Sequence, residues 1–264
     1  MPQEVEIVSP KQEHEFIETC FELASESHFW FKWRFEAFLQ MVKSLHIPID
    51  EPLRVLDVGA GSGVVRTQVE AATSWNVDIT DLHLDALRSS AAGRGTTYYY
   101  DILEKKPEWK GKYDAIILFD VLEHIESTAE FIEAILFHIK EGGYLFLNVP
   151  ALPLLYSRYD EVQEHYRRYK IGTLASEFSE TPADILDIHY WGWLNLPLLL
   201  VRRFWLRFFS QNVSDEEVYR RGFSPPGALV NSIFLKMMSF ELLLPRQRLA
   251  GSSILLTLRK TVHS

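Results

Sequence analysis

The sequence contains one cysteine, Cys20, among its 264 residues. One thiol excludes an internal disulfide and a cysteine-rich zinc cluster, so we expect Cys20 to be a buried, unreactive side chain. The chain also lacks any run of about 18 or more uncharged apolar residues, so no membrane-spanning helix is expected. The acidic N-terminal stretch 1–15 lacks the apolar centre of a signal peptide. Together these absences predict a cytoplasmic protein.

Basic residues are in short supply, with 27 Lys and Arg against 36 Asp and Glu and a formal net charge of −9. This balance argues against nucleic acid as a partner, because binding to phosphates depends mainly on positive charge. The contents of 47% hydrophobic and 24% charged residues are those of an ordinary globular protein. The length predicts one domain with additions, which we expect to be a monomer or a homodimer.

Strand-like and helix-like segments alternate from about residue 53 onward, whereas residues 11–46 carry apolar residues at helical spacing. The apolar segments that we expect to be strands are 54–58, 75–79, 96–102, 113–119, 142–150, 183–191 and 252–260. Such alternation predicts an α/β fold with a parallel sheet covered on both faces. A helix is expected over about 127–140, and two more lie within an insertion at about 192–248. We therefore predict a helical cap over residues 1–50 and a domain over 51–264.

The stretch "RVLDVGAGSG" (54–63) places three glycines directly after the first predicted strand of this domain. Glycine lets the chain turn sharply and lets its backbone approach another group closely. A strand, a glycine turn and a helix in this order present backbone N–H groups to a bound cofactor. The alternative is a purely structural turn, which any α/β protein can contain.

Two cofactor classes fit this turn. A nicotinamide site prefers a small residue at position 64, where this chain has Val64. Asp78 closes the second strand and could accept hydrogen bonds from both ribose hydroxyls of either cofactor. Asp101 and Ile102 at the end of the third strand, and "FDVLEHI" (119–125) at the end of the fourth, favour S-adenosylmethionine.

The ordered set "LDVGAGSG", "NVDI", "YYDI", "YDAIILFDVLEHI" and "GGYLFLNVP" resembles the class I S-adenosylmethionine-dependent methyltransferases. It is most similar to the branch that includes the ubiquinone-biosynthesis O-methyltransferases and bacterial enzymes of glycan and secondary metabolism. The resemblance covers about residues 50–150, with weaker likeness in "HFWFKWRFEAF" (28–38) and "YDEVQEHYRRY" (159–169). It implies a Rossmann-like three-layer sandwich with a seven-stranded sheet of order 3-2-1-4-5-7-6, whose last strand is antiparallel.

The resemblance also implies roles for individual residues. The glycines would line the methionine part of the cofactor, Asp57 would orient its ammonium group, Asp78 would bind the ribose, and Asp101 with Ile102 would hold the adenine. The complete expected cofactor set is Asp57, Gly59, Ala60, Gly61, Gly63, Asp78, Ile79, Asp101, Ile102, Phe119 and Asp120. The residues expected to bind the acceptor are Trp30, Arg34, Arg167 and Tyr169.

Two histidines are candidate catalytic bases. His124 follows Glu123 at the mouth of the sheet, and His165 lies in the polar segment after the fifth strand. A base is required only if the acceptor is a hydroxyl that must lose its proton. The alternatives are a backbone-bonded His124 and a His165 within an ion-paired surface. Some ubiquinone-type relatives bind a divalent metal with such a Glu-His pair and a further acid, but Ser127 stands where that acid would be, so we predict no metal.

The expected function is O-methylation of a small molecule, natural product or glycan precursor with S-adenosylmethionine as the cofactor. The alternatives are transfer to nitrogen or carbon, a nicotinamide-type Rossmann enzyme, and a binding module without catalysis. Segment 191–209 interleaves Trp, Phe and Leu with arginines. It could contact a membrane surface peripherally, cover a lipid-linked acceptor, or pack against its own domain or a second copy.

Overall fold

A computed structural model describes residues 4–11, 28–209, 214–218, 227–244, 246 and 249–262, and the side chains of residues 206–209 are not described. Cys20 lies outside these residues, as do residues 12–27 of the expected N-terminal helix. Parts of the expected insertion also lie outside them. The predictions for these segments and for the domain boundaries therefore stay predictions.

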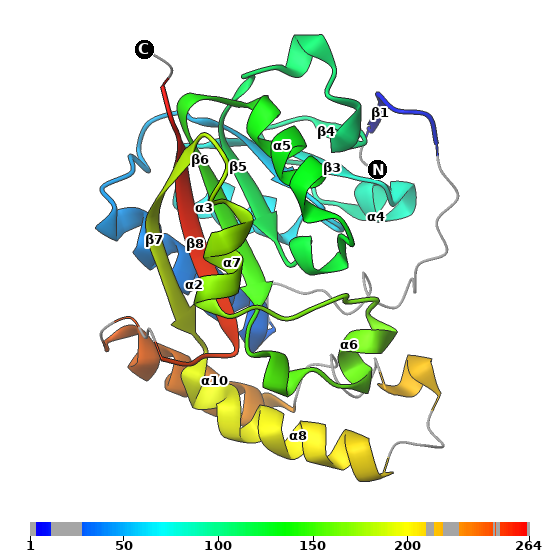
Figure 1. The fold of residues 1–264 in the computed structure, drawn as a ribbon, viewed down its shortest axis with the longest axis vertical. Coiled ribbons are helices and arrows are strands. Elements are labelled where there is room, and N and C mark those ends of the chain that lie inside the picture. Colours follow the sequence, from blue (N-terminus) through cyan, green and yellow to red (C-terminus); the bar gives the residue numbers. More distant parts are fainter. Residues whose placement is uncertain are drawn as a thin grey trace.

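One eight-stranded sheet forms the centre of the described structure, in the order β1-β4-β3-β2-β5-β6-β8-β7 (Figure 1). Its strands are β1 (Glu6–Ile7), β2 (Arg54–Val58), β3 (Asn76–Asp81), β4 (Thr97–Tyr99), β5 (Tyr113–Phe119), β6 (Ile139–Pro150), β7 (Ala183–Trp191) and β8 (Ser253–Lys260). Strand β8 runs antiparallel to both of its neighbours, while the other pairs are parallel. Without the short β1, this is the predicted order 3-2-1-4-5-7-6, and the prediction is confirmed with one additional strand.

Helices cover both faces of the sheet and make it a three-layer sandwich (Figure 1). The helices are α2 (Phe29–Ser44), α3 (Val64–Ala72), α4 (Leu84–Ser89), α5 (Thr128–His138), α6 (Arg158–Val162), α7 (Ile171–Glu177), α8 (Leu196–Phe209) and α10 (Ala228–Leu242). One hydrophobic core lies between the sheet and α2, α3 and α4, and the other lies between the sheet and α5 and α7.

The apolar strands follow from burial on both faces. In β5, Ile116 and Leu118 belong to the core under α5, whereas Ala115 and Ile117 belong to the core under α2. Successive side chains of a strand point to opposite faces, so a strand covered on both sides is apolar at nearly every position.

The largest differences from the predicted strand boundaries are in β3, β4 and β6. Strand β3 continues two residues beyond 79, to Asp81, and β6 begins at Ile139 because the chain pairs with β5 directly after α5. The third predicted strand covers only Thr97–Tyr99, because Asp101 caps a short 3₁₀ turn by accepting a hydrogen bond from the N–H of Leu103. The first of these differences changes the assignment of a site residue.

The insertion places α8 and α10 at one end of the molecule, beyond the last residues of β7 (Figure 1). The buried carboxylate of Glu241 in α10 accepts hydrogen bonds from the N–H groups of Gly192 (2.5 Å) and Leu194 (3.1 Å). The ring of Phe234 stacks on that of Phe29 in α2, with centroids 4.3 Å apart. These contacts fix α10 between β7 and the cap helix. Within the described part of the chain, no helix combines the length and apolar character that crossing a membrane requires.

Candidate active site

A cavity of about 970 Å³ opens where strands β2 to β5 end, between the sheet, α2, α8 and the segment that contains α6. Ligands of open α/β sheets bind at this edge. The predicted site residues that line the cavity are Asp57, Gly59, Ala60, Gly61, Asp101, Ile102, Phe119, Asp120, Trp30, Arg34, His124 and His165. The predicted residues that do not line it are Gly63, Asp78, Ile79, Arg167 and Tyr169.

The glycine loop has the backbone geometry that the sequence predicted. Gly59, Gly61 and Gly63 have φ angles of 72°, 52° and 75°, in the left-handed region that glycine adopts without strain. A Cβ on Gly59 would lie 2.4 Å from a methyl carbon of Val121. The N–H of Gly61 donates to the carboxylate of Asp81 at 2.8 Å. Gly63 precedes α3 and shapes the loop without lining the cavity.

Asp57, the penultimate residue of β2, lies beside this loop with a buried carboxyl at the cavity. Its Oδ2 atom is buried and has no hydrogen-bond partner among the described residues. Burial raises the pKa of Asp57 to about 7, against the opposing charges of Arg34 and Arg66. An unpaired buried carboxyl is costly, and a cationic group of a ligand in the cavity would satisfy it.

Asp78, which was expected to bind the ribose, does not line the cavity. Its carboxylate lies away from the cavity, bonded to Arg54 (3.1 Å), the hydroxyl of Tyr113 (3.2 Å) and the N–H of Thr96 (2.8 Å). Strand β3 continues to Asp81, which lines the cavity. Side chains alternate along a strand, so Asp78 and Asp81 point to opposite faces.

Ile79 is also not a cavity residue. Its side chain is fully buried in the core under α2, α3 and α4, and it packs near Gly63. The apolar contacts of Ile79 are therefore made within the protein core.

The end of β4 forms another wall of the cavity. The N–H of Asp101 donates to Ser9 Oγ at 2.8 Å, and the side chain of Asp101 caps the turn that begins at Ile102. Both residues line the cavity, and Ile102 is buried. This carboxylate and this apolar side chain can face an adenine ring and its amino group.

Arg34 of α2 forms an ion pair with Asp120, with an N–O distance of 2.6 Å. Its guanidinium lies 5.1 Å from the ring centroids of both Phe31 and Phe119. Asp120 has a φ of 57°, and its other carboxylate oxygen accepts a hydrogen bond from Asn148 at 2.6 Å. The pair connects the cap helix to the ends of β5 and β6. Arg34 was expected to bind the acceptor; it lines the cavity, and its charge is already paired with the carboxylate of Asp120.

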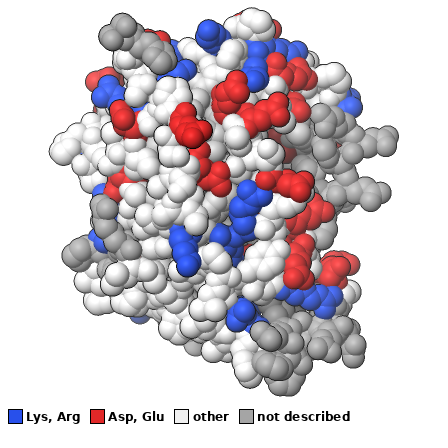
Figure 2. Space-filling model, viewed as in Figure 1, with Lys and Arg blue, Asp and Glu red and all other residues white. Residues whose placement is uncertain are grey.

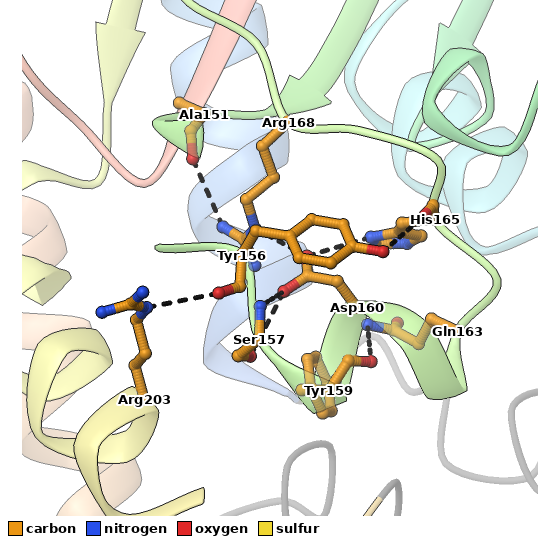
Figure 3. A network of polar contacts seen from close by, with 9 residues as sticks. All are labelled: Ala151, Tyr156, Ser157, Tyr159, Asp160, Gln163, His165, Arg168 and Arg203. Carbon is orange, nitrogen blue, oxygen red and sulfur yellow. Dashed lines mark hydrogen bonds and ion pairs between the residues drawn. The ribbon is translucent and has the colours of Figure 1, made fainter. Parts of the chain in front are cut away.

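Figure 3 shows a polar network around Asp160, the buried centre of the segment after β6. Asp160 Oδ1 accepts from Arg168 Nε at 2.6 Å and lies 3.2 Å from His165 Nδ1, while Oδ2 accepts from the N–H of Ser157 at 2.9 Å (Figure 3). Burial alone would raise the pKa of Asp160, but the hydrogen bond with His165 and the charge of Arg168 lower it. The carboxylate is therefore ionised and fixes the orientation of the His165 ring at the cavity.

Glu123, His124 and His165 form what we call the acid–histidine cluster, with one ligand atom of each within 4.8 Å of the others. Both carboxyl oxygens of Glu123 are buried without a hydrogen-bond partner among the described residues. Burial and the charge of Asp120 raise the pKa of Glu123 well above its ordinary value. Burial and the neighbouring His165 ring lower the pKa of His124 to about 3, so His124 is neutral.

The acid–histidine cluster bears on the expectation that no metal binds. One carboxylate and two imidazoles form a donor set that a divalent transition-metal ion accepts. The unpartnered Glu123 carboxyl fits such an ion, with the third ligand coming from the segment after β6 and not from position 127. The absence of a metal therefore stays a prediction, and it is one that chelation can test.

Two predicted acceptor residues lie elsewhere. Arg167 donates to the carbonyl of Glu126 at 2.7 Å, and Tyr169 is buried in the core under α5 and α7. The neighbouring Arg168 lines the cavity instead. The chain between α6 and the bridge at Ala151 and Tyr169 is irregular, so sequence spacing does not determine which side chain faces the cavity.

The expected site residues did not include Asp81, Asp160, Arg168 or Arg202, and they included Glu123 only as part of a possible metal-binding pair. Asp81 carried a usable signal, because the run "NVDITD" allows a strand that ends on its second acid. Asp160 is the second residue of the polar segment 159–169, but nothing in the sequence pattern shows that it is buried.

Comparison with known proteins agrees with this geometry. A family model described as a methyltransferase domain matches residues 30–194, more than half of the chain. The ubiquinone biosynthesis O-methyltransferase of Rickettsia canadensis is 29% identical over 44% of this chain and 50% of its own length. The enzyme of that name from Shewanella pealeana is 31% identical over 36% of this chain and 42% of its own length. This chain thus spans about half the length of the curated relatives that it matches.

The fold is also shared with solved structures. The phosphoethanolamine N-methyltransferase 2 of Haemonchus contortus, solved with S-adenosyl-L-methionine, superimposes with a TM-score of 0.54 at 17% identity. The match covers 87% of this chain and 52% of that one. The family model, the relatives and the sheet order agree, and this chain belongs to the methyltransferase domain family of class I S-adenosylmethionine-dependent enzymes.

Proposed function

We propose that this protein transfers the methyl group of S-adenosylmethionine to a hydroxyl oxygen of a small-molecule acceptor. The glycine loop and the unpaired Asp57 carboxyl support binding of the zwitterionic methionine end of the cofactor. Asp81, in place of Asp78, accepts the ribose hydroxyls, and Asp101 with Ile102 holds the adenine.

The cofactor supplies an activated methyl group, because its sulfonium leaves as a neutral thioether. The protein must then align the acceptor oxygen with the methyl carbon and exclude water. Such alignment can lower the activation free energy by several kcal/mol. The largely apolar walls from α2 and α8, including Trp30, Phe31, Leu198 and Leu199, serve this purpose. Arg202 of α8 adds a cation for a polar or anionic part of the acceptor.

The observation that carries the choice of oxygen is the pair of His165 and Asp160. The ionised Asp160 holds Nδ1 of the imidazole and leaves Nε2 for an acceptor in the cavity. A neutral imidazole held in this way accepts the proton of a hydroxyl as the methyl bond forms. His124 is the weaker candidate, because a pKa of about 3 makes it a poor proton acceptor. The names of the relatives, which are O-methyltransferases, agree with this choice.

Transfer to nitrogen or carbon is the alternative reaction, and glycan and lipid-linked compounds are alternative acceptors. An unprotonated amine needs no base, so a nitrogen acceptor would leave the His165–Asp160 pair without a catalytic role. The location in the cytoplasm, the absence of nucleic acid as a partner and the oligomeric state stay predictions.

The test is a screen of phenols, catechols, amines and hydroxylated sugars for formation of S-adenosylhomocysteine. With an accepted hydroxyl compound, His165→Ala should lower turnover by roughly 100-fold, and Asp160→Asn should lower it by a smaller factor. Calorimetry should show unchanged S-adenosylhomocysteine affinity in both variants. His124→Ala is the matched control and should retain more activity than His165→Ala. Full turnover of His165→Ala, or a screen that yields only amine substrates, would contradict the proposal.

A further inference from the structure

Three arginines of the described residues line the cavity, namely Arg34, Arg168 and Arg202. Ion pairs of 2.6 Å with aspartates neutralise the first two. No carboxylate of the described residues pairs with Arg202, whose guanidinium lies 4.2 Å from the ring centroid of Tyr159. Arg202 therefore offers the cavity a positive charge that the described part of the protein does not neutralise.

The arginines around Arg202 have structural partners. Arg203, the next residue of α8, donates to the carbonyl of Tyr156 at 3.2 Å (Figure 3), and Arg158 pairs with Asp215 at 2.8 Å. Neither Arg203 nor Arg158 lines the cavity, and both connect separate segments of the chain. Arg202 differs from them, because it lines the cavity and bonds to no carbonyl or carboxylate of the described residues.

Tyr159 holds Arg202 in a poorly hydrated place. The ring of Tyr159 is buried and packs with Val162 and Val218 in a small hydrophobic cluster. Burial lowers the pKa of Arg202, but a guanidinium stays protonated at any ordinary pH. A charge that is removed from water costs free energy unless an opposite charge compensates it. An anionic group of a ligand in the cavity would provide that compensation.

The charges that line the cavity are separated into two parts. At the ends of β2 to β5 are four acids, Asp57, Asp81, Asp101 and Asp120. The chain after β6 supplies Arg168 and Arg202, together with Glu164, whose side chain is exposed to water. The acidic part suits the sulfonium and ammonium groups of S-adenosylmethionine. The basic part is left for the acceptor.

The net charge of the protein does not exclude an anionic acceptor. The chain has a formal charge of −9, but Figure 2 shows that its charges are unevenly distributed. Basic side chains gather near the centre of the face drawn there, and acidic ones lie mainly above them and to their right (Figure 2). Attraction of a small anion depends on the charges close to its site more than on the total charge.

We propose that the methyl acceptor carries a carboxylate or phosphate group that Arg202 binds, on the same molecule as the hydroxyl that faces His165. This inference rests on the proposed function, because it names the chemical class of that acceptor. A guanidinium binds the oxygens of either group through two parallel hydrogen bonds. Tyr159, which contacts Arg202, adjoins Asp160, which holds His165. The anion site and the base therefore lie on one wall of the cavity, so that binding of the anion orients the hydroxyl.

The experiment measures binding separately from methyl transfer. Calorimetry on the full chain saturated with S-adenosylhomocysteine compares benzoate with benzamide, and phenyl phosphate with phenol. At least one anion should bind about tenfold or more tightly than its neutral partner, and the pair with the larger difference identifies the group as carboxylate or phosphate. Arg202→Gln should abolish this preference, whereas Arg202→Lys should retain part of it, because it keeps the charge but not the paired hydrogen bonds.

Arg203→Gln is the matched control, because Arg203 lies on the same helix but does not line the cavity. It should keep the preference, and urea unfolding should show that every variant is folded. With an anionic hydroxyl compound that the enzyme methylates, Arg202→Gln should raise KM by about tenfold or more and change kcat less, whereas His165→Ala should lower kcat.

Equal binding of the charged and neutral partners by the unchanged protein would overturn the inference, and so would a preference that persists in folded Arg202→Gln. Neither result would bear on methyl transfer to an uncharged hydroxyl compound. A preference that depends on Arg202, in a protein that methylates no compound of the screen, would support the anion site and contradict the proposed function alone.

Discussion

Replacing Asp57 with Asn should stabilise the protein without its cofactor and weaken cofactor binding at the same time. The carboxyl is fully buried, and its pKa is raised from an ordinary value of 3.8 to about 7. An acid whose pKa is raised by folding destabilises the folded state wherever the unfolded chain is ionised. This effect grows as the pH rises from the unfolded to the folded pKa and is constant above it.

The magnitude follows from these two pKa values. At pH 8 the buried carboxyl opposes folding by about 4 kcal/mol, and at pH 5 by about 2 kcal/mol, because each pKa unit corresponds to roughly 1.4 kcal/mol. An amide does not ionise, so the stability gained by Asp57→Asn should be larger at pH 8 than at pH 5. The expected difference between the two gains is on the order of 2 kcal/mol. The amide is still a buried polar group, so the absolute gain is smaller than the carboxyl penalty.

The assay is urea unfolding of both proteins without cofactor from pH 5 to pH 8. Calorimetry with S-adenosylmethionine should show affinity lowered by about tenfold or more in the variant, because a charge-assisted contact to the ammonium group is lost. In the unchanged protein the affinity should fall as the pH drops below about 7, since protonation removes the carboxylate. An equal stability difference at both pH values would refute the reasoning about Asp57.

The remaining predictions concern the cavity. Asp81→Ala should weaken S-adenosylhomocysteine binding by about 1.5–3 kcal/mol for each charged hydrogen bond lost. Asp78→Ala should mainly lower stability in urea, because its carboxylate bonds to Arg54. If calorimetry shows that only Asp78→Ala weakens binding, Asp78 is the ribose-binding residue. Gly59→Ala should lower both stability and cofactor affinity, because its Cβ would collide with a neighbouring side chain at a φ of 72°. Gly172→Ala in α7, with open space around its Cβ, should leave cofactor affinity unchanged and should not lower stability, because alanine favours a helix more than glycine does. If the acid–histidine cluster binds a divalent ion, elemental analysis should detect metal in the purified protein, and EDTA should lower its melting temperature. A purified protein that contains no metal and is unaffected by EDTA would agree with the expectation that no metal binds.

The strand order could be predicted from sequence because burial on both faces leaves a strong apolar signal. Strand β5, with its apolar run 113–119, was placed to the residue for this reason. The resemblance in the ordered motifs then supplied the sheet order, including the antiparallel last strand. The glycine loop could be predicted because only glycine adopts three left-handed φ angles in five residues without strain.

The site was harder to predict where a small difference in chain position determines which side chain faces the cavity. Asp78 and Asp81 both stand near the end of one strand, and only the point where β3 stops determines which acid meets the cavity. The same holds for Arg167 and Arg168 in an irregular segment, whose side chains point in different directions. Burial of Asp160 and Glu123 depends on contacts between distant segments, which no local pattern records.

The short strand β1 has a consequence for how copies of the protein can associate. It pairs with β4 along the edge of the sheet, and Lys106 holds the adjoining chain by donating to the carbonyl of Val8 at 2.6 Å. At the opposite edge, β7 carries a register shift between Ile185 and Asp187, which disrupts the regular row of backbone groups. A two-residue strand and an irregular strand are poor templates for a strand from another molecule. The sheet is thereby protected against edge-to-edge aggregation, even though its interior strands are almost wholly apolar.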